Sequence, residues 1–466
     1  MTLPPQLIML SWIPIVLYLF RKFKPIEAVI ISFIVAWLFL PQQAGFALPG
    51  LPDYERMSAT VFGIILATII FDLDRFKQFY FSWVDLPMAV WCLSPLLSSV
   101  SNDLGFYNGF ALLLIRTVSY GAPYFLGRIY LNDLQGLRKL AIGIFVGGLI
   151  YVPLCLFEVR MSPQLHRLVY GYHGNPSFIQ TIRYGGFRPT VFMQHGLAVS
   201  IWMMAATLIG IWFWKTGVVK EVYGLHIRWL VGILLVTFIL LKSTAAYGFL
   251  FLGVAFLFIA WQFHTSVTLL VLIISMSIYL QQNVVVDSTI NERIIETLEL
   301  VAPEERVASL QFRFDNEELL KEKAKERIVL GWSGWGRNRV YDYDWKGELV
   351  DVTITDSLWI LAFGMNGLVG LIALFGSVLV PVLSFMWYFP AKTWSNARVA
   401  PAAVLTIIIS LYMLDCLLNN QPNPIFTLAT GGISGLIVLE PLRHYAKQRQ
   451  PLKLGTNWPA RGDRLN

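Results

Sequence analysis

Charged residues are scarce in this chain of 466 residues. Asp, Glu, Lys and Arg make up 14% of it, whereas about 25% is usual in soluble proteins. Hydrophobic residues make up 56%, including 16 Trp and 32 Phe. In water such a composition would leave large apolar patches exposed, but in lipid the same surface is the natural outside of a helix bundle. The composition excludes a soluble enzyme, a disordered scaffold and a secreted disulfide module, and it predicts a polytopic membrane protein.

Cysteine is scarce as well. The chain has only Cys92, Cys155 and Cys416, and each lies inside an apolar run without a metal-binding spacing such as CxxC. Such residues are typical of small buried hydrophobic side chains. We therefore expect no metal site at these cysteines.

Apolar stretches that approach the length of a membrane-spanning helix, about 20 residues, recur along the chain. They predict an all-α polytopic membrane protein with about 12–13 transmembrane helices and one large external loop. The candidate spans lie near residues 6–20, 26–42, 58–72, 82–100, 106–127, 139–158, 191–213, 228–242, 245–262, 265–283, 357–388, 399–419 and 424–442.

The positions of Lys and Arg predict how the chain crosses the membrane. Alternate connections and the C-terminal segment carry 19 of the 36 Lys and Arg residues, and the short connections on the other side carry six. Because positive charge concentrates on the cytoplasmic side, we expect a cytoplasmic C-terminus and an external long loop. Arg116 alone lies within a span, where we expect it to be paired within the bundle or to lie near a water-filled cavity. The net charge of +7 suits anionic membrane lipids and does not call for nucleic acid.

This topology divides the chain into four parts. They are residues 1–283 with helices 1 to 10 and a smaller external loop at 159–190, the large loop at 284–356, residues 357–442 with the last three helices, and a basic cytoplasmic tail at 443–466. The large loop holds sixteen acidic and ten basic residues and has helical apolar spacing in its first half. We expect a partly helical lid over a site at the outer membrane surface, the alternative being an ordinary solvated loop.

Cations mark the point where the smaller external loop meets the next helix, in the segment RYGGFRPTVFMQHGLA. Arg183 and Arg188 suit a phosphate-bearing headgroup, because guanidinium groups bind oxyanions bidentately and stay charged. His195 follows them, and Lys242, in LLKSTAAYG at the outer end of another helix, adds a further positive charge. The alternative is that these side chains only reach toward lipid headgroups.

Four segments occur in an order known from one protein family. QFRFDNEELLKEKAKERIVLGWSGWGRNR, followed by TDSLWILAFGMNGLVGLIALF, resembles an arginine-bearing helix, a glycine turn and the helix after them in the O-antigen ligase and O-antigen polymerase (Wzy-type) superfamily. FRPTVFMQHGLA and LLKSTAAYG resemble two arginine-containing segments of the same family. The resemblance covers roughly residues 80–440.

The resemblance implies a metal-independent glycosyltransferase without a cofactor in the bacterial inner membrane. Its donor would be an undecaprenyl-diphosphate-linked glycan on the periplasmic face, and its acceptor another lipid-linked glycan or the lipid A core. The product would be a surface polysaccharide, either exopolysaccharide or O-antigen, which is the outer part of lipopolysaccharide. In the family, arginines hold the diphosphate leaving group and a loop histidine is the proposed general base.

The chain keeps part of that residue pattern. Arg188 matches the first arginine of the family, whereas the second falls on Thr244, with Lys242 two residues earlier able to supply the charge. The histidine position falls on Asp356. Asp356 is therefore a candidate general base, the alternative being an N-cap for the following helix.

Other residues complete the candidate site. His195 is the second candidate base, and His173 is also external by the predicted topology. Arg188 and Lys242 are expected to stabilise the diphosphate leaving group. Arg183, Arg313 and Arg337 are the further candidates for this role.

Two functions of other classes stay open. A flippase or transporter could move a lipid-linked glycan without making a bond, although such proteins place ionisable groups near the membrane midplane and contain repeated halves. A non-catalytic subunit of a polysaccharide-export complex would tolerate neutralisation of Arg188, whereas an enzyme would not. The sequence does not separate a ligase from a polymerase.

Overall fold

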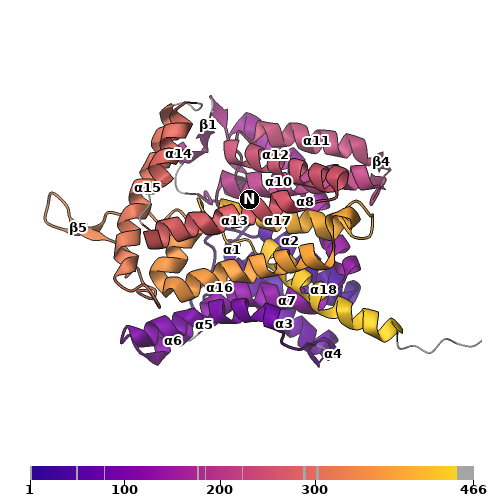
Figure 1. Cartoon of the computed structure of the whole chain (residues 1–466), viewed down its shortest axis with the longest axis horizontal. Coiled ribbons are helices and arrows are strands. Elements are labelled where there is room, and N and C mark those ends of the chain that lie inside the picture. The colour runs from indigo at the N-terminus through magenta and orange to yellow at the C-terminus, as the bar shows by residue number, and fades with distance from the viewer. Residues whose placement is uncertain are drawn as a thin grey trace, which may run out of the picture.

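The computed structural model describes residues 3–448 except 49–50, 78, 176–177, 184, 223, 287–289 and 301–303. The chain is mostly helical, and long helices run across the view of Figure 1. Three short antiparallel hairpins lie in the connections. Most of the predicted tail at 443–466 lies outside the described residues.

The helices follow one another through the whole described chain. They are α1 (Pro5–Lys22), α2 (Pro25–Phe39), α3 (Arg56–Phe71), α4 (Asp74–Lys77), α5 (Leu86–Ser101), α6 (Gly105–Arg116), α7 (Ala122–Tyr130), α8 (Leu134–Met161), α9 (Leu165–Tyr170), α10 (Gly196–Thr216), α11 (Ile227–Leu240), α12 (Thr244–Phe263), α13 (Val267–Gln281), α14 (Ile290–Glu299), α15 (Glu304–Lys325), α16 (Leu358–Tyr388), α17 (Ala400–Asp415) and α18 (Pro424–Gln448). The hairpins pair β1 (Ile182–Arg183) with β2 (Gly186–Phe187), β3 (Glu221–Val222) with β4 (Leu225–His226), and β5 (Tyr341–Tyr343) with β6 (Leu349–Asp351).

Every one of the thirteen predicted apolar ranges contains a helix. Within the described residues, seven helices are long and apolar enough to cross a membrane: Trp83–Ser101, Gly105–Tyr130, Leu134–Met161, Gly196–Thr216, Thr244–Phe263, Val267–Val284 and Leu358–Tyr388. Five more apolar helices have 10–17 residues. The all-α membrane class is supported, whereas the full number of 12–13 spans stays a prediction.

The connections gather at two different ends of the bundle. The α7–α8, α10–α11 and α16–α17 connections meet around one cavity of about 730 Å³. The α2–α3, α8–α10, α11–α12, α13–α16 and α17–α18 connections meet around other cavities. Figure 1 shows α14, α15 and β5 at the left, away from the C-terminal part of α18. The alternation agrees with the predicted order of connections, and the side of the membrane that each end faces stays a prediction.

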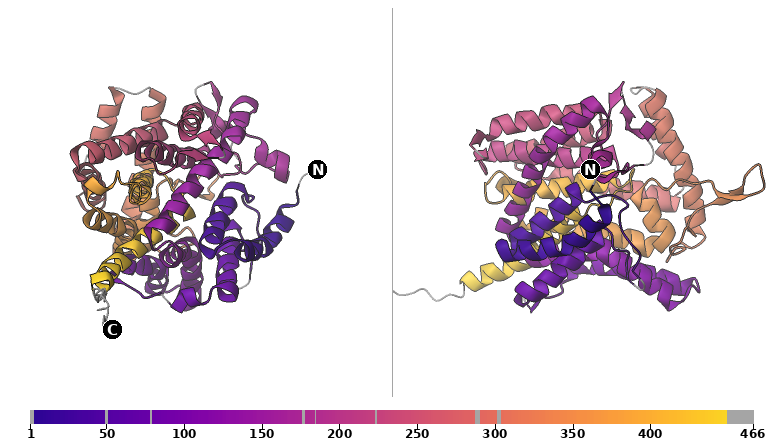
Figure 2. Two further views of the ribbon diagram at one scale, coloured as in Figure 1. Left: turned by 90° about the vertical axis from the view of Figure 1, so that its right-hand side faces the viewer. Right: turned by 180° about the vertical axis from the view of Figure 1, so that it is seen from behind.

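Close backbone contact joins α7 to α18. A Cβ added to Gly127 would lie 2.0 Å from the Leu428 carbonyl oxygen, and one added to Gly431 would lie 1.9 Å from that of Tyr124. Only glycine permits this approach, which is a common way for helices to pack in lipid. The N-terminal helices α1 to α3 lie together at one side of the bundle (Figure 2).

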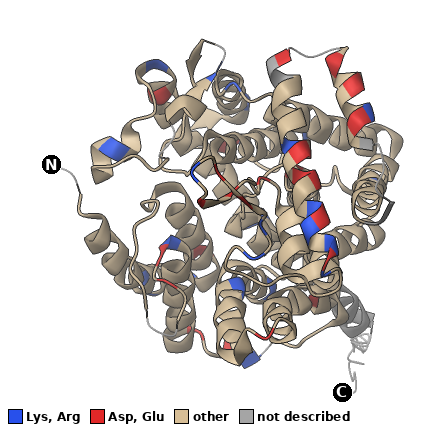
Figure 3. Ribbon diagram, turned by 90° about the vertical axis from the view of Figure 1, so that its left-hand side faces the viewer, with Lys and Arg blue, Asp and Glu red and all other residues tan. Residues whose placement is uncertain are grey.

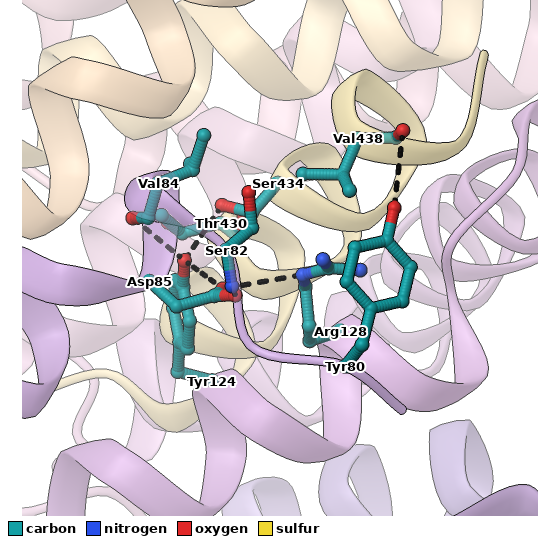
Figure 4. A network of polar contacts seen from close by, with 9 residues as sticks. All are labelled: Tyr80, Ser82, Val84, Asp85, Tyr124, Arg128, Thr430, Ser434 and Val438. Atoms are coloured by element: carbon teal, nitrogen blue, oxygen red, sulfur yellow. Dashed lines mark hydrogen bonds and ion pairs between the residues drawn. The ribbon is translucent and has the colours of Figure 1, made fainter. Parts of the chain in front are cut away.

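A buried ion pair lies beside the α7–α18 contact (Figure 4). Arg128 Nε is 3.1 Å from Asp85 Oδ1, and both side chains are almost fully buried. The Tyr124 hydroxyl is 3.0 Å from the same carboxylate oxygen and 2.9 Å from Ser434 Oγ. Loss of either charged partner would leave a buried charge, at a cost of about 3–5 kcal/mol, so the network fixes how α5, α7 and α18 meet.

The helix α16 is interrupted at Gly367, whose φ of 63° and ψ of −161° are not helical. Backbone hydrogen bonds of 2.8–3.2 Å join the peptide groups around this break to the turn that follows α15. They run from Trp332 N to Gly364 O, from Ser333 N to Met365 O, from Leu368 N to Ile328 O and from Val369 N to Val329 O. A broken helix is tolerated in a membrane where protein groups satisfy its peptide bonds, so segment 328–333 completes α16.

Polar side chains surround the same break. Asn102 Nδ2 donates to the Gly331 carbonyl at 2.9 Å. Arg116 Nη2 donates to Asn366 Oδ1 at 3.2 Å, and the Arg116 guanidinium lies 3.6 Å from the centre of the Trp91 ring. The expectation that Arg116 is paired within the bundle is therefore met.

Substitution of Gly367 by Ala should release segment 328–333. The new Cβ would lie 2.2 Å from the Val329 carbonyl oxygen at a backbone conformation that alanine rarely adopts. We expect faster proteolysis of residues 326–356 in purified protein, measured as the cleavage rate by a dilute protease. Gly248→Ala is the matched control, because a Cβ there meets nothing within 4 Å. Equal cleavage rates for the two variants would contradict the role given to the break.

Candidate functional site

Two adjoining cavities lie where several connections meet. Their volumes are about 370 and 230 Å³, and both are lined by Arg183, Arg188 and Arg313. His195 and Asp356 line the larger cavity, and Lys242 lines the smaller. Six of the eight site residues that the sequence suggested thus come together, from three separate connections and α15.

Arg188 lies against the first turn of α10. Its side chain is 8% exposed, and its Nη2 donates to Ser243 Oγ at 3.0 Å. A Cβ on Gly196 would lie 2.7 Å from Arg188 Cγ, so glycine at the start of α10 makes room for the arginine. The guanidinium thereby links the start of α10 to the start of α12.

Both of these helices direct their N-termini at the cavities. His195 and Ser243 are the N-cap residues of α10 and α12, and neither side chain makes a capping hydrogen bond. Gly196 lines the larger cavity and Thr244 the smaller. Because a helix N-terminus carries about half a positive charge and unsatisfied N–H groups, the two ends add to the attraction for an anion.

The segment after Arg188 is held by a buried carboxylate. Glu158, near the end of α8, is fully buried and accepts from the backbone N–H groups of Leu165, Thr190 and Val191 at 2.7–2.9 Å. Sequence reasoning missed Glu158. A lone acidic residue in an apolar run was the available signal.

Lys242 also lines the smaller cavity. Its backbone has a φ of 55°, and a Cβ added to Gly186 would lie 2.2 Å from Lys242 Nζ. The ammonium group therefore lies against the β1–β2 hairpin that carries Arg183. Lys242 shares this cavity with Arg188, as the resemblance requires of a cation that replaces the second arginine.

Asp356 forms an ion pair with Arg313 of α15, with Oδ2 3.7 Å from Nε. Arg313 Nη1 also donates to the Leu418 carbonyl at 2.9 Å and to Asn419 Oδ1 at 3.2 Å. The alternative that Asp356 caps the following helix is wrong, because α16 begins at Leu358 and its N-cap is Ser357. The Asp356 carboxylate instead joins α15 to the start of α16 at the cavity wall.

His195 lies between charged and polar groups. Its Nδ1 is 3.0 Å from Asn175 Nδ2. Burial, and after it the charge of Arg188, lower the pKa of His195 below its ordinary value, although Asp356 acts in the opposite sense. The imidazole is therefore neutral at physiological pH and able to accept a proton.

Two suggested residues do not join the cluster. Arg337 is exposed in the turn after α15, and His173 is exposed in the α9–α10 connection. Neither is among the residues that line the two cavities. Arg337 therefore lies outside the cluster of cations in which the sequence analysis placed it.

Uncharged amides complete the lining and were missed by sequence reasoning. They are Asn175, Gln180, Gln194, Asn419, Asn420 and Gln421. Amides in loops carry no pattern that separates them from ordinary turn residues. Among the described residues, no group of three or more His, Cys, Asp and Glu side chains could hold a metal ion.

Figure 3 faces the end of the molecule that carries the long connection, where Lys and Arg alternate with Asp and Glu along the long helix. Glu317 of α15 lies in a stretch of alternating charges but is only 5% exposed. Ser357 Oγ donates to Glu317 Oε1, and Trp359 Nε1 donates to the same oxygen at 3.3 Å. Glu317 therefore fastens α15, with Arg313, to the start of α16.

Burial raises the pKa of Glu317 to about 7, against the opposing effects of the Ser357 and Trp359 hydrogen bonds and the charge of Arg313. The folded protein thus binds a proton that the unfolded chain, with an ordinary carboxyl, releases at lower pH. The stabilisation by this proton is complete in acid and is lost as the pH rises toward 7.

Neither the protein-family models nor the curated proteins give a match to this chain.

Glu317→Gln should remove the pH dependence of stability that the buried Glu317 carboxyl produces. We expect the variant to melt at a higher temperature than the wild type at pH 8 and at a similar temperature at pH 5, because a neutral amide avoids the cost of a buried charge. Thermal unfolding of the purified protein at both pH values measures the effect. Glu322→Gln, at an exposed position on the same helix, should leave the wild-type profile unchanged. A Glu317→Gln profile that parallels the wild type would contradict the buried-proton assignment.

Proposed function

We propose that this protein is a glycosyltransferase of the O-antigen ligase and polymerase type in the bacterial inner membrane. It transfers a glycan from undecaprenyl diphosphate to an acceptor hydroxyl on the periplasmic face, for synthesis of O-antigen or exopolysaccharide. The observation that carries the proposal is the convergence of Arg183, Arg188, Lys242 and Arg313 on two adjoining cavities.

The charge balance of the cavities supports a diphosphate ligand. Four cationic side chains and two helix N-termini face a single carboxylate, Asp356, which is paired with Arg313. A diphosphate carries several negative charges and many acceptor oxygens, which guanidinium and ammonium groups bind well. The amides in the lining add donors that suit the sugar next to the diphosphate.

The reaction exchanges one bond for another. An oxygen of the acceptor hydroxyl forms a bond to the anomeric carbon of the donor sugar, and the bond from that carbon to the diphosphate oxygen breaks. The diphosphate leaves with the bonding electron pair, and the hydroxyl proton passes to a base. Because the developing charge lies on the diphosphate, the cations around the cavities stabilise the transition state more than the ground state.

His195 serves best as the base. Its neutral imidazole lies in the wall of the larger cavity. With the Asn175 amide turned so that its oxygen accepts from Nδ1–H, the lone pair of Nε2 is available for the acceptor proton. Asp356 is already engaged with Arg313, and it orients the cation while His195 takes the proton.

One observation favours movement of a lipid-linked glycan without bond formation. The break in α16 at Gly367 resembles the discontinuous helices that transporters use to bind substrates, and Arg116 lies beside it. This second candidate, a flippase, predicts that Arg116 and not Arg188 is essential. A non-catalytic subunit would tolerate the loss of both.

Substitution of Arg188 by Ala should lower glycan transfer by about 100-fold or more, since it removes a buried charge at the leaving group. Transfer is measured with protein in lipid nanodiscs and an undecaprenyl-diphosphate oligosaccharide. Arg337→Ala is the matched control, because this exposed arginine does not line the cavities. Equal transfer by the two variants, with both proteins monodisperse, would refute the diphosphate site.

His195→Gln should reduce the transfer rate by about 100-fold or more, the usual contribution of a general base. In the wild type, the rate should fall in acid only below the ordinary pKa of histidine, because the pKa of His195 is lowered. Asp356→Asn should reduce the rate and keep the fall in acid, which moves to lower pH because the carboxylate no longer raises the pKa of His195. If the fall of the rate at acid pH disappears in Asp356→Asn but persists in His195→Gln, then Asp356 is the base.

A further inference from the structure

A third cavity of about 370 Å³ adjoins the larger of the two described above. The two share Gln194, His195, Asn420 and Gln421 in their walls. The new cavity extends away from the cationic cluster, toward α2 and the start of α3, and Trp37, Gln43 and Arg56 line that part. His195 therefore lies at the boundary between a cationic space and one of different character.

The third cavity has two buried donors without acceptors. Trp37 Nε1 and Arg56 Nη1 are both buried and have no hydrogen-bond partner within the described part of the chain. The Arg56 guanidinium lies over the Trp37 ring, 4.4 Å from its centre, so each side chain holds the other in position. Because buried donors are nearly always satisfied in native proteins, two of them in one cavity wall indicate that a ligand supplies oxygen atoms here.

The remaining lining indicates what kind of ligand this is. One acidic side chain, Glu55, accompanies Arg56, so the cavity lacks the excess of positive charge that a diphosphate needs. Aromatic rings and amides make up much of the rest, from Trp37, Tyr120, Gln42, Gln43, Gln194 and Gln421. Flat rings that pack against C–H groups, together with planar amides and a mixed pair of charges, match the alternating apolar faces and hydroxyl edges of a sugar.

We propose that this cavity binds the sugar end of the acceptor, with Trp37 Nε1 and Arg56 Nη1 donating to its hydroxyl or ring oxygens. This inference rests on the proposed function and adds to it a second, neutral carbohydrate subsite. The acceptor hydroxyl then reaches His195 from one side, and the diphosphate-linked sugar reaches it from the other. Trp37 and Arg56 are binding residues for the acceptor and take no part in proton transfer.

The test measures acceptor binding without turnover. The probe is a free oligosaccharide, prepared by partial acid hydrolysis of the surface polysaccharide of the source organism, titrated into purified protein in lipid nanodiscs. We expect Trp37→Phe, which keeps the ring and removes only the N–H, and Arg56→Gln each to weaken binding about tenfold, as expected when one donor to the ligand is lost. Trp387→Phe and Arg21→Gln make the same chemical changes at exposed positions and should bind like the wild type.

Further variants separate this inference from the proposed function. Arg188→Ala should retain oligosaccharide binding, because it alters the diphosphate side. In transfer assays, Trp37→Phe and Arg56→Gln should raise the acceptor KM and leave the donor KM unchanged. Wild-type affinity in both variants, no binding to the wild type, or a raised donor KM in place of the acceptor KM would each overturn the subsite. The protein could bind the oligosaccharide through Trp37 and Arg56 and yet catalyse no transfer. That result would support the sugar site and refute the proposed reaction.

Discussion

A helix that is interrupted within an apolar bundle must have its freed peptide groups hydrogen-bonded by other parts of the protein, because lipid provides no partners. In this chain segment 328–333 provides those bonds to α16 at Gly367. The long connection is thereby fixed to the bundle, and Glu317 fastens α15 to the start of α16. These two attachments bring Arg313 within ion-pair distance of Asp356 at the cavity wall.

The arrangement of charge around His195 gives the site its two-sided character. Cations and helix N-termini lie around the cavities on one side, and aromatic rings, amides and a mixed pair of charges lie on the other. An anionic donor and a neutral acceptor would each find the environment that matches them. The histidine at their boundary stays neutral because burial and Arg188 disfavour its charged form.

Much of the helical architecture could be predicted from the sequence, because apolar runs of spanning length leave few alternatives to a helix in lipid. Arg188 and Lys242 were identifiable because isolated cations at the ends of apolar segments are costly without a role. Glu317 was not, since it lies in a stretch of alternating charges that is typical of a solvated helix. The break at Gly367 was hidden within a continuous apolar run, and the contact between Trp37 and Arg56 joins two helices through packing that no local pattern encodes. Arg337 shows the opposite error, because a cation in the right segment lies away from the cavities.

The proposed glycan transfer can be tested by measuring both of its products in one reaction. Purified protein in lipid nanodiscs is given an undecaprenyl-diphosphate oligosaccharide and a choice of acceptors, and released undecaprenyl diphosphate is measured together with glycan size and anchoring. The proposed reaction yields equal amounts of released lipid and of lengthened or re-anchored glycan, and the product distinguishes a polymerase from a ligase. Intact donor in the presence of folded protein and every acceptor would contradict it.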